Sequence, residues 1–310
     1  MKAAVIGTGM MGPGIAMTLT LGGVEAVILG RTEASAQAGL AAALGQLALL
    51  ASNDLVTPEQ VQFSEAHLRA SPSFEVEVAA ADLVIESGPE NLEFKRYLFA
   101  RMDALTGGIL TSNTSGLSVT AIAERCLRPE RVMTTHFWNP PHLMPLVEIV
   151  MGARTSLDLA ERMRDLLRRC GKVPVVVKKD TPGQLGNRMH MALVREAAHI
   201  VSEGIADAAE VDLAARMSFG LRLPMYGLLE HMDIVGLDMS MGILEYVSTD
   251  LYNGVEAPRR YRELVANGDL GAKTGRGFYD WTEKSADEAR ARRDEFVLRM
   301  LRWHRERSTS

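Results

Sequence analysis

Over the first 180 residues, short apolar runs rich in β-branched residues alternate with longer stretches whose apolar residues recur at helical spacing. Strands that alternate with helices pair side by side, so this pattern predicts an α/β domain with a Rossmann-type, doubly wound parallel sheet. Such sheets bind ligands beyond the carboxyl ends of their strands. The expected strands are Ala3–Ile6, Ala26–Leu29, Leu83–Ile85, Ile109–Thr111, Val132–Thr135, Leu146–Val150 and Val173–Val177.

The pattern changes after Asp180. Thr181-Pro182-Gly183 interrupts the alternation of strands and helices, and the apolar positions that follow repeat at helical spacing. We therefore expect a dinucleotide-binding domain over residues 1–180 and an all-helical C-terminal domain over residues 181–310. The second domain would close over the substrate and could carry a dimer interface. Its last segment, residues 283–307, predicts a charged amphipathic helix packed on the body or on a neighbouring subunit.

Composition narrows the class of protein. The chain has 310 residues, 47% of them hydrophobic and 24% charged, with a net charge of −5, which argues against nucleic acid as a partner. Its two cysteines, Cys126 and Cys170, make neither a disulfide framework nor a zinc site. No uninterrupted apolar run reaches the roughly 18 residues of a membrane span, and no signal peptide is visible. We expect a cytoplasmic protein without a membrane partner.

A glycine motif follows the first expected strand. Gly7, Gly9 and Gly12 stand at Gly-x-Gly-x-x-Gly spacing, with Met10 and Met11 between them, and a helical pattern begins at once. In such a motif the first glycine permits a tight turn, the second lets the backbone approach a pyrophosphate, and the third allows close packing of the helix. The helix N-terminus then faces the anion. The motif predicts a dinucleotide cofactor.

The end of the second strand bears on the choice of cofactor. NAD-binding sheets usually carry an acid there, but this chain has Gly30 followed by Arg31 and Thr32. Arginine can bind a 2′-phosphate through paired hydrogen bonds, so we expect an NAD(P) cofactor with a preference for NADP. Two alternatives stay open: Arg31 is a solvated surface residue, or Glu33 replaces the missing acid.

Polar residues cluster after two later strands and at the domain boundary. His136 follows Val132–Thr135, and Glu148 lies twelve residues further on. A histidine can take a proton while a carboxylate fixes its tautomer, although a lone histidine at a strand end is often only structural. Ser115 and Asn187 belong to two further polar stretches, and either could instead cap a helix. No Cys or second His is suitably spaced for zinc, so no metal is expected.

At this point the chain resembles the L-3-hydroxyacyl-CoA dehydrogenase family over residues 1–282. The resemblance implies that His136 is the general base, that Glu148 is its partner, and that Ser115 and Asn187 hold the substrate oxygen and the imidazole. It also implies cofactor contacts from Glu90, Lys95, Asn139 and Lys273. The shared motifs are Gly-x-Gly-x-x-Gly, Ser112-Asn113-Thr114-Ser115, His136-Phe137-Trp138-Asn139-Pro140, Glu148, Pro182-Gly183-x-x-x-Asn187-Arg188 and Lys273-Thr274-Gly275-x-Gly277-Phe278-Tyr279.

Two departures bear on the substrate. CoA-using members carry a lysine-rich stretch where this chain has Ala51-Ser52-Asn53-Asp54-Leu55. The segment Asn139–Pro145, with its double proline, is similar to the branch that contains lambda-crystallin (gulonate 3-dehydrogenase) and the pyridine-carboxylate dehydrogenases. The substrate is therefore either a 3-hydroxyacyl-CoA or a CoA-free hydroxy acid or alcohol. The resemblance also implies a homodimer.

Three rival classes remain. A non-catalytic, crystallin-like role conflicts with an intact set of His136, Glu148 and Asn187. A dehydrogenase of the 3-hydroxyisobutyrate type relies on a catalytic lysine, which the histidine motif argues against. A nucleotide-sensing regulator would need a DNA-binding helix pair or a basic face, and neither is visible.

Overall fold

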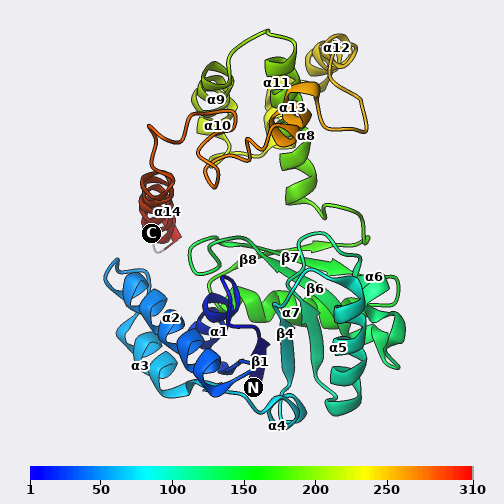
Figure 1. The fold of residues 1–310 in the computed structure, drawn as a ribbon. Helices are drawn as coiled ribbons and strands as arrows, with labels where there is room; N and C mark the ends of the chain where they lie inside the picture. The colour runs from blue at the N-terminus through cyan, green and yellow to red at the C-terminus, as the bar shows by residue number, and fades with distance from the viewer. Residues whose placement is uncertain (309–310) are drawn as a thin grey trace. The chain divides into compact units, whose positions relative to one another are not determined.

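The computed structural model, drawn in Figure 1, describes residues 1–308. It is built around an eight-stranded sheet in the order β3-β2-β1-β4-β5-β6-β7-β8. The α/β class and the Rossmann-type sheet are confirmed. Every neighbouring pair is parallel except β6 and β7, which pair antiparallel within the otherwise parallel sheet. The strands are β1 (Lys2–Ile6), β2 (Glu25–Leu29), β3 (Leu68–Ser71), β4 (Leu83–Glu86), β5 (Ile109–Ser112), β6 (Val132–Phe137), β7 (Leu146–Met151) and β8 (Val173–Val177).

Alternate residues of the buried strands feed two apolar cores, because successive side chains of a strand point to opposite faces. Ala3 and Val5 of β1 pack in the core that includes α1, α2 and α7, whereas Ala4 packs in the core with α4, α5 and α6. Helices therefore cover both faces of the sheet, as a parallel sheet requires. The carboxyl ends of β1–β6, which all run in one direction, therefore lie along one edge of the sheet, and the loops that follow these strands lie there.

The helices follow the predicted alternation with the strands. Helix α1 starts directly at the glycine motif, and α2 begins with a capping box in which Thr32 and Ser35 satisfy each other's backbone N–H groups. The helices are α1 (Gly12–Leu21), α2 (Glu33–Ala51), α3 (Pro58–His67), α4 (Phe74–Ala79), α5 (Leu92–Leu105), α6 (Val119–Ile122), α7 (Leu157–Arg169), α8 (Gly186–Ser202), α9 (Ala208–Met217), α10 (Phe219–Arg222), α11 (Leu228–Val235), α12 (Leu237–Ser248), α13 (Arg259–Ala266) and α14 (Ala286–Ser308), with short 3-10 helices η1 (Ala123–Arg125) and η2 (Pro129–Arg131).

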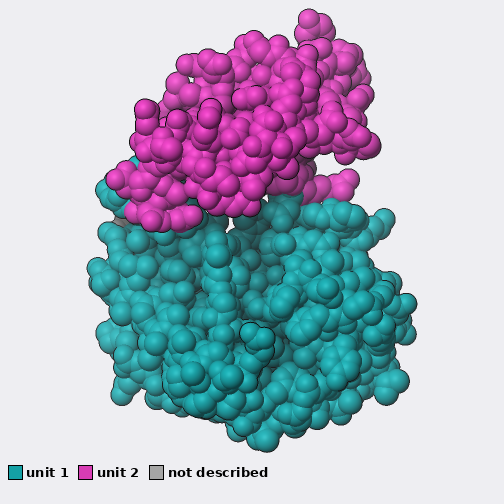
Figure 2. Space-filling model, viewed as in Figure 1, with its two compact units in different colours: residues 1–187, 292–310 teal, residues 188–291 magenta. Residues whose placement is uncertain are grey.

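The chain divides into two compact units, coloured separately in Figure 2. We call residues 1–187 with 292–310 the sheet unit and residues 188–291 the helical unit. The division falls seven residues after the expected boundary at 180. The charged tail was expected to continue the helical domain, but its residues from 292 belong to the sheet unit, because Leu298 of α14 is buried in the core that contains α1 and α2.

One helix within residues 1–308, α2, is long and apolar enough to cross a membrane by length and composition. That test is weak, since buried helices of other proteins also pass it. In this fold α2 packs on α1 and on the sheet, with Ala43, Leu47 and Leu50 buried in the core.

Candidate active site

His136 and Glu148 lie directly opposite each other on the antiparallel strands β6 and β7. Directly opposed residues project to the same face, so the pairing itself brings the two side chains together. His136 Nδ1 is 2.8 Å from Glu148 Oε2, with His136 only 7% exposed and Glu148 fully buried. Because a carboxylate only accepts hydrogen bonds, Nδ1 carries the proton of the neutral imidazole and Nε2 is the nitrogen that can take another.

Glu148 is held by four hydrogen bonds. Oε1 accepts from the backbone N–H groups of Leu185 and Gly186, both at 2.8 Å, and Oε2 accepts from His136 and from Trp138 Nε1 at 3.1 Å. Burial acts to raise the pKa of Glu148, but these hydrogen bonds outweigh it and lower the pKa to about 2. Glu148 is therefore an anion at neutral pH and stabilises a protonated imidazole.

The segment after β8 is shaped to deliver those two backbone donors. An ideal Cβ on Gly186 would lie 2.6 Å from Trp138 Cζ2, so this position requires glycine. Next to it, Asn187 Nδ2 donates to the backbone oxygen of Ser115 at 3.4 Å. The predicted residues His136, Glu148, Asn187 and Ser115 thus belong to one hydrogen-bonded region. Asn187 reaches the backbone of Ser115, however, and not its hydroxyl.

Sequence reasoning missed Gln184 in this region. Gln184 is 5% exposed, and its Nε2 donates to the backbone oxygen of Thr114 at 2.9 Å. With the Asn187 contact, this ties the loop after β5 to the start of α8. A glutamine inside a Pro-Gly-x-x-x-Asn motif carries no sign of that role, because its partner is a backbone atom seventy residues away.

The glycine motif has the geometry that a dinucleotide needs. Gly7 has a φ of 120°, and an ideal Cβ there would lie 2.4 Å from the backbone oxygen of Ser87. A Cβ on Gly12 would lie 1.9 Å from the oxygen of Gly7. A Cβ on Gly9 would meet no atom within 4 Å, so the fold itself does not demand glycine there, whereas close approach of a pyrophosphate does. Helix α1 also has no side-chain cap on its first N–H groups.

A buried ion pair stands at the end of the neighbouring strand β4. Lys95 Nζ lies 2.6 and 2.7 Å from the two oxygens of Glu86, and both residues are at most 1% exposed. Ser112 Oγ and the backbone N–H of Gly88 also donate hydrogen bonds to the Glu86 carboxylate, each at 2.6 Å. Sequence reasoning named Lys95 and overlooked Glu86. The sequence did contain a signal for Glu86, because an acid follows directly on the apolar residues of the strand Leu83–Glu86.

The other predicted cofactor residues are dispersed. Glu90 is exposed; it accepts one hydrogen bond from the Thr114 hydroxyl and one from the Gly116 N–H, and lies 3.7 Å from Lys95 Nζ. Thr32 caps α2. The remaining predicted residues are Met10, Arg31 and Asn139, which are exposed in the sheet unit, Met11, which is the N-cap of α1, and Lys273, which is exposed in the helical unit.

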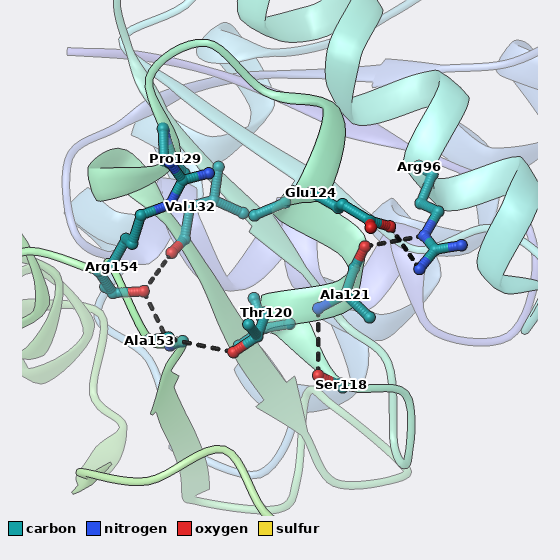
Figure 3. Close-up of a pocket in the computed structure, with 13 residues that line it drawn as sticks. Arg96, Ser118, Thr120, Ala121, Glu124, Pro129, Val132, Ala153 and Arg154 are labelled. Atoms are coloured by element: carbon teal, nitrogen blue, oxygen red, sulfur yellow. Dashed lines mark hydrogen bonds and ion pairs between the residues drawn. The ribbon is translucent and has the colours of Figure 1, made fainter.

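A different cavity, of about 360 Å³, opens beside α5 and α6 (Figure 3). It reaches Val132 at the amino end of β6, whereas His136 lies near the carboxyl end of that strand. Two arginines, Arg96 and Arg154, line it, and Arg96 is already paired with Glu124 at 2.5 Å. This cavity is therefore separate from the His136–Glu148 pair. In the described part of the chain no cluster of His, Cys, Asp and Glu could hold a metal ion.

The sheet, the glycine motif and the histidine–glutamate pair define a dinucleotide-dependent dehydrogenase. The comparisons with known proteins refine this class. The family model for the NAD binding domain of 3-hydroxyacyl-CoA dehydrogenase matches residues 2–181, and the model for the C-terminal domain matches residues 183–281. The chain belongs to the 3-hydroxyacyl-CoA dehydrogenase family and is an oxidoreductase with an NAD-binding domain.

Relatives fall into two groups. The chain is 32% identical, over 96% of its length and 97% of the relative, to 5-formyl-3-hydroxy-2-methylpyridine 4-carboxylate 5-dehydrogenase of Mesorhizobium japonicum. A solved structure of an enzyme of that name, described as an NAD⁺-dependent dismutase, has a TM-score of 0.89 at 30% identity and covers 97% of this chain and 98% of its own. The chain is also 36% identical to a probable 3-hydroxybutyryl-CoA dehydrogenase of Bacillus subtilis, over 91% and 98% of the two chains.

Proposed function

We propose that the protein oxidises a secondary alcohol reversibly, with His136 as general base and Glu148 as its anionic partner. The observation that carries this proposal is the 2.8 Å contact between His136 Nδ1 and a carboxylate whose pKa is lowered to about 2. The dinucleotide, when bound, supplies the hydride acceptor for oxidation and the hydride donor for reduction. In the sheet unit, Gly7, Gly9, Gly12 and the start of α1 would hold its pyrophosphate.

The tautomer of His136, with its proton on Nδ1, determines which ring nitrogen accepts the proton of the substrate. His136 Nε2 removes the hydroxyl proton as the carbon–hydrogen bond breaks, and the imidazole becomes positively charged. Glu148 stabilises that charge through the Nδ1–H bond, while its other hydrogen bonds keep the carboxylate from rotating away. In the reverse direction, the imidazolium returns the proton to the forming alkoxide.

For the substrate we propose a free hydroxy acid or alcohol rather than a CoA thioester. Asn53 belongs to the stretch that corresponds to the lysine-rich segment of the CoA-using members, and its Oδ1 accepts a hydrogen bond at 2.5 Å from Arg302 of α14. Helix α14 follows the segment matched by the family models, which ends at residue 281. The tail thus covers the end of α2. The pyridine-carboxylate relative, similar over nearly the whole chain, supports this assignment.

A 3-hydroxyacyl-CoA is the second candidate, supported by the 36% identity to a relative named a 3-hydroxybutyryl-CoA dehydrogenase. A panel that pairs each free hydroxy acid with its CoA thioester separates the two. We expect kcat/KM for the free compounds to be higher by at least tenfold. Faster turnover of the thioesters would contradict the CoA-free assignment without affecting the role of His136.

The preference for NADP over NAD stays a prediction. It rests on Arg31, which pairs with no carboxylate among residues 1–303, whose side chains the structure describes, and on Gly30, where an ideal Cβ would lie 2.5 Å from Ala36 N. That contact disfavours an acid at position 30 in this conformation. The name of the family's NAD binding domain and the NAD⁺-dependent relative point the other way. Michaelis constants for both cofactors, in the wild type and in Arg31→Ala, test the prediction. It is contradicted if the wild type prefers NAD.

We also propose that the protein is a dimer formed through its helical unit. Helices α9, α10, α11 and α12 contain no buried residue. Large apolar side chains there are well exposed, including Leu229 at 82%, Ile234 at 68% and Leu244 at 65%. An apolar surface of this kind is typical of a subunit interface. Light scattering of the wild type and of Leu244→Glu tests this proposal: we expect a dimer that the substitution weakens, and a monomeric wild type would contradict it.

A further inference from the structure

The sheet unit contains a second, larger cavity, of about 860 Å³, that the reaction does not use. Residues of α1, α2, α3, α14 and the segment between β6 and β7 line it, and neither His136 nor Glu148 is among them. Its volume is in the range of small-molecule sites. Most of its wall is aliphatic, made by Leu21, Leu50, Leu55, Val56, Leu143 and Leu301.

One buried ammonium group lines this cavity. Lys172 is 8% exposed, and its Nζ donates to the backbone oxygens of Pro141 at 2.6 Å and Met144 at 3.1 Å. An ammonium has three donors, so one more hydrogen bond is available. Arg168 also lines the cavity, and none of its described lining residues is an acid. A buried cation without an anionic partner is costly, so the cavity is complementary to an anion.

Two further polar groups of this cavity lack partners. Thr18 is 1% exposed, and its Oγ1 makes no hydrogen bond with any described residue. The same holds for Nδ1 of His142. Burial, with a smaller contribution from the charge of Lys172, lowers the pKa of His142 to about 4, so this imidazole is neutral at pH 7. Buried polar atoms are normally hydrogen-bonded, so two unpartnered atoms on residues that line one cavity call for a partner that no described residue supplies.

We propose that this cavity binds a small aliphatic carboxylate, at a site separate from the His136–Glu148 pair. The carboxylate accepts from the Lys172 ammonium, the Thr18 hydroxyl adds a hydrogen bond, and the chain contacts the leucine wall. A bound water would satisfy the hydrogen bonds of the polar atoms but would leave the aliphatic residues of the wall in contact with water. A cationic ligand would be repelled by Lys172 and Arg168. Leu301 forms part of the wall, so the tail helix α14 is part of the site.

Calorimetric titration of the full chain with decanoate and with decanol tests the proposal, because the two probes share a chain and differ in charge. We expect one decanoate molecule to bind per chain and the Kd of decanol to be at least tenfold higher than that of decanoate. Lys172→Met should weaken decanoate at least tenfold and leave decanol unchanged. Thr18→Val should weaken decanoate about threefold, and the exposed Lys179→Met serves as the matched control with no effect.

A cavity-filling variant keeps the test decisive if Lys172→Met fails to fold, since Lys172 also holds the segment between β6 and β7. Leu301→Trp changes a partly exposed residue of α14 and should abolish binding of both probes while circular dichroism and dinucleotide binding stay normal. The proposal is overturned if the wild type does not bind decanoate, if decanol binds equally well, or if folded Leu301→Trp binds decanoate like the wild type.

Discussion

Glu86 and Glu148 are two fully buried carboxylates of the same sheet, and each accepts four hydrogen bonds. They differ in the partner. Glu86 faces the ammonium of Lys95 at 2.6 Å. Glu148 faces the imidazole of His136, which can be neutral or charged. The first pair joins the end of β4 to α5, whereas the imidazole of the second pair can gain and lose a proton during a reaction.

The largest effect is expected from removing the imidazole. His136→Ala should lower kcat by roughly 10²–10⁴, because the alcohol loses its proton acceptor, while the Kd of the dinucleotide stays nearly unchanged. His67→Ala, at an exposed histidine of the sheet unit, is the control and should be unaffected. Near-normal turnover of His136→Ala would end the proposed role of this residue.

Breaking the buried ion pair between Glu86 and Lys95 should mainly lower the free energy of unfolding. Glu86→Gln leaves the buried Lys95 ammonium with only the exposed Glu90 carboxylate, 3.7 Å away, as a counter-charge. We expect a loss of about 3–5 kcal/mol in the free energy of urea unfolding. The double variant Glu86→Gln/Lys95→Met removes both charges and should recover most of that loss. If the double variant is as unstable as the single one, the charge balance is not what stabilises this region.

A smaller effect on turnover is expected at the titratable pair. Glu148→Gln keeps the shape, but an amide cannot accept from all four donors and carries no charge. We expect kcat to fall roughly 10–10²-fold, because the imidazolium loses its anion. Steady-state kinetics measure this change, and circular dichroism checks the fold. An unchanged kcat would make Glu148 a merely structural acid.

The pH dependence of stability should also report on Glu148. Its pKa is lowered from 4.5 to about 2 in the folded protein, so the carboxylate stabilises the fold fully above about pH 4.5. That contribution is lost as the pH falls toward 2, because protonation then removes the acceptor. The difference in unfolding free energy between the wild type and Glu148→Gln should therefore shrink from pH 6 to pH 3.5. A constant difference would contradict the lowered pKa.

Much of the fold was predictable because local patterns encode it. Apolar runs located seven of the eight strands, and the glycine motif located α1. Strand β3 was missed because Leu68–Ser71 is short and contains a charged arginine. The antiparallel direction of β7 was also missed, since a strand's own sequence does not state its direction. The place of the tail depends on the burial of Leu298 against residues far away in the chain.

The site was predictable in its residue types but not in its contacts. A resemblance in motif named His136 and Glu148, yet only the register of β6 and β7 brings them face to face. Glu86 and Gln184 were missed because their partners, Lys95 and the backbone of Thr114, are defined by tertiary structure. The backbone donors to Glu148 carry no side-chain signal at all.

The central claim is that His136 and Glu148 act as one proton-transfer unit, and a double-mutant cycle tests it most directly. Single-turnover rates of hydride transfer are measured for the wild type, His136→Ala, Glu148→Gln and the double variant at one pH. If Glu148 acts through His136, the double variant is about as slow as His136→Ala alone, because the carboxylate has nothing left to stabilise. If the two losses multiply in the double variant, the residues act independently and the claim is contradicted.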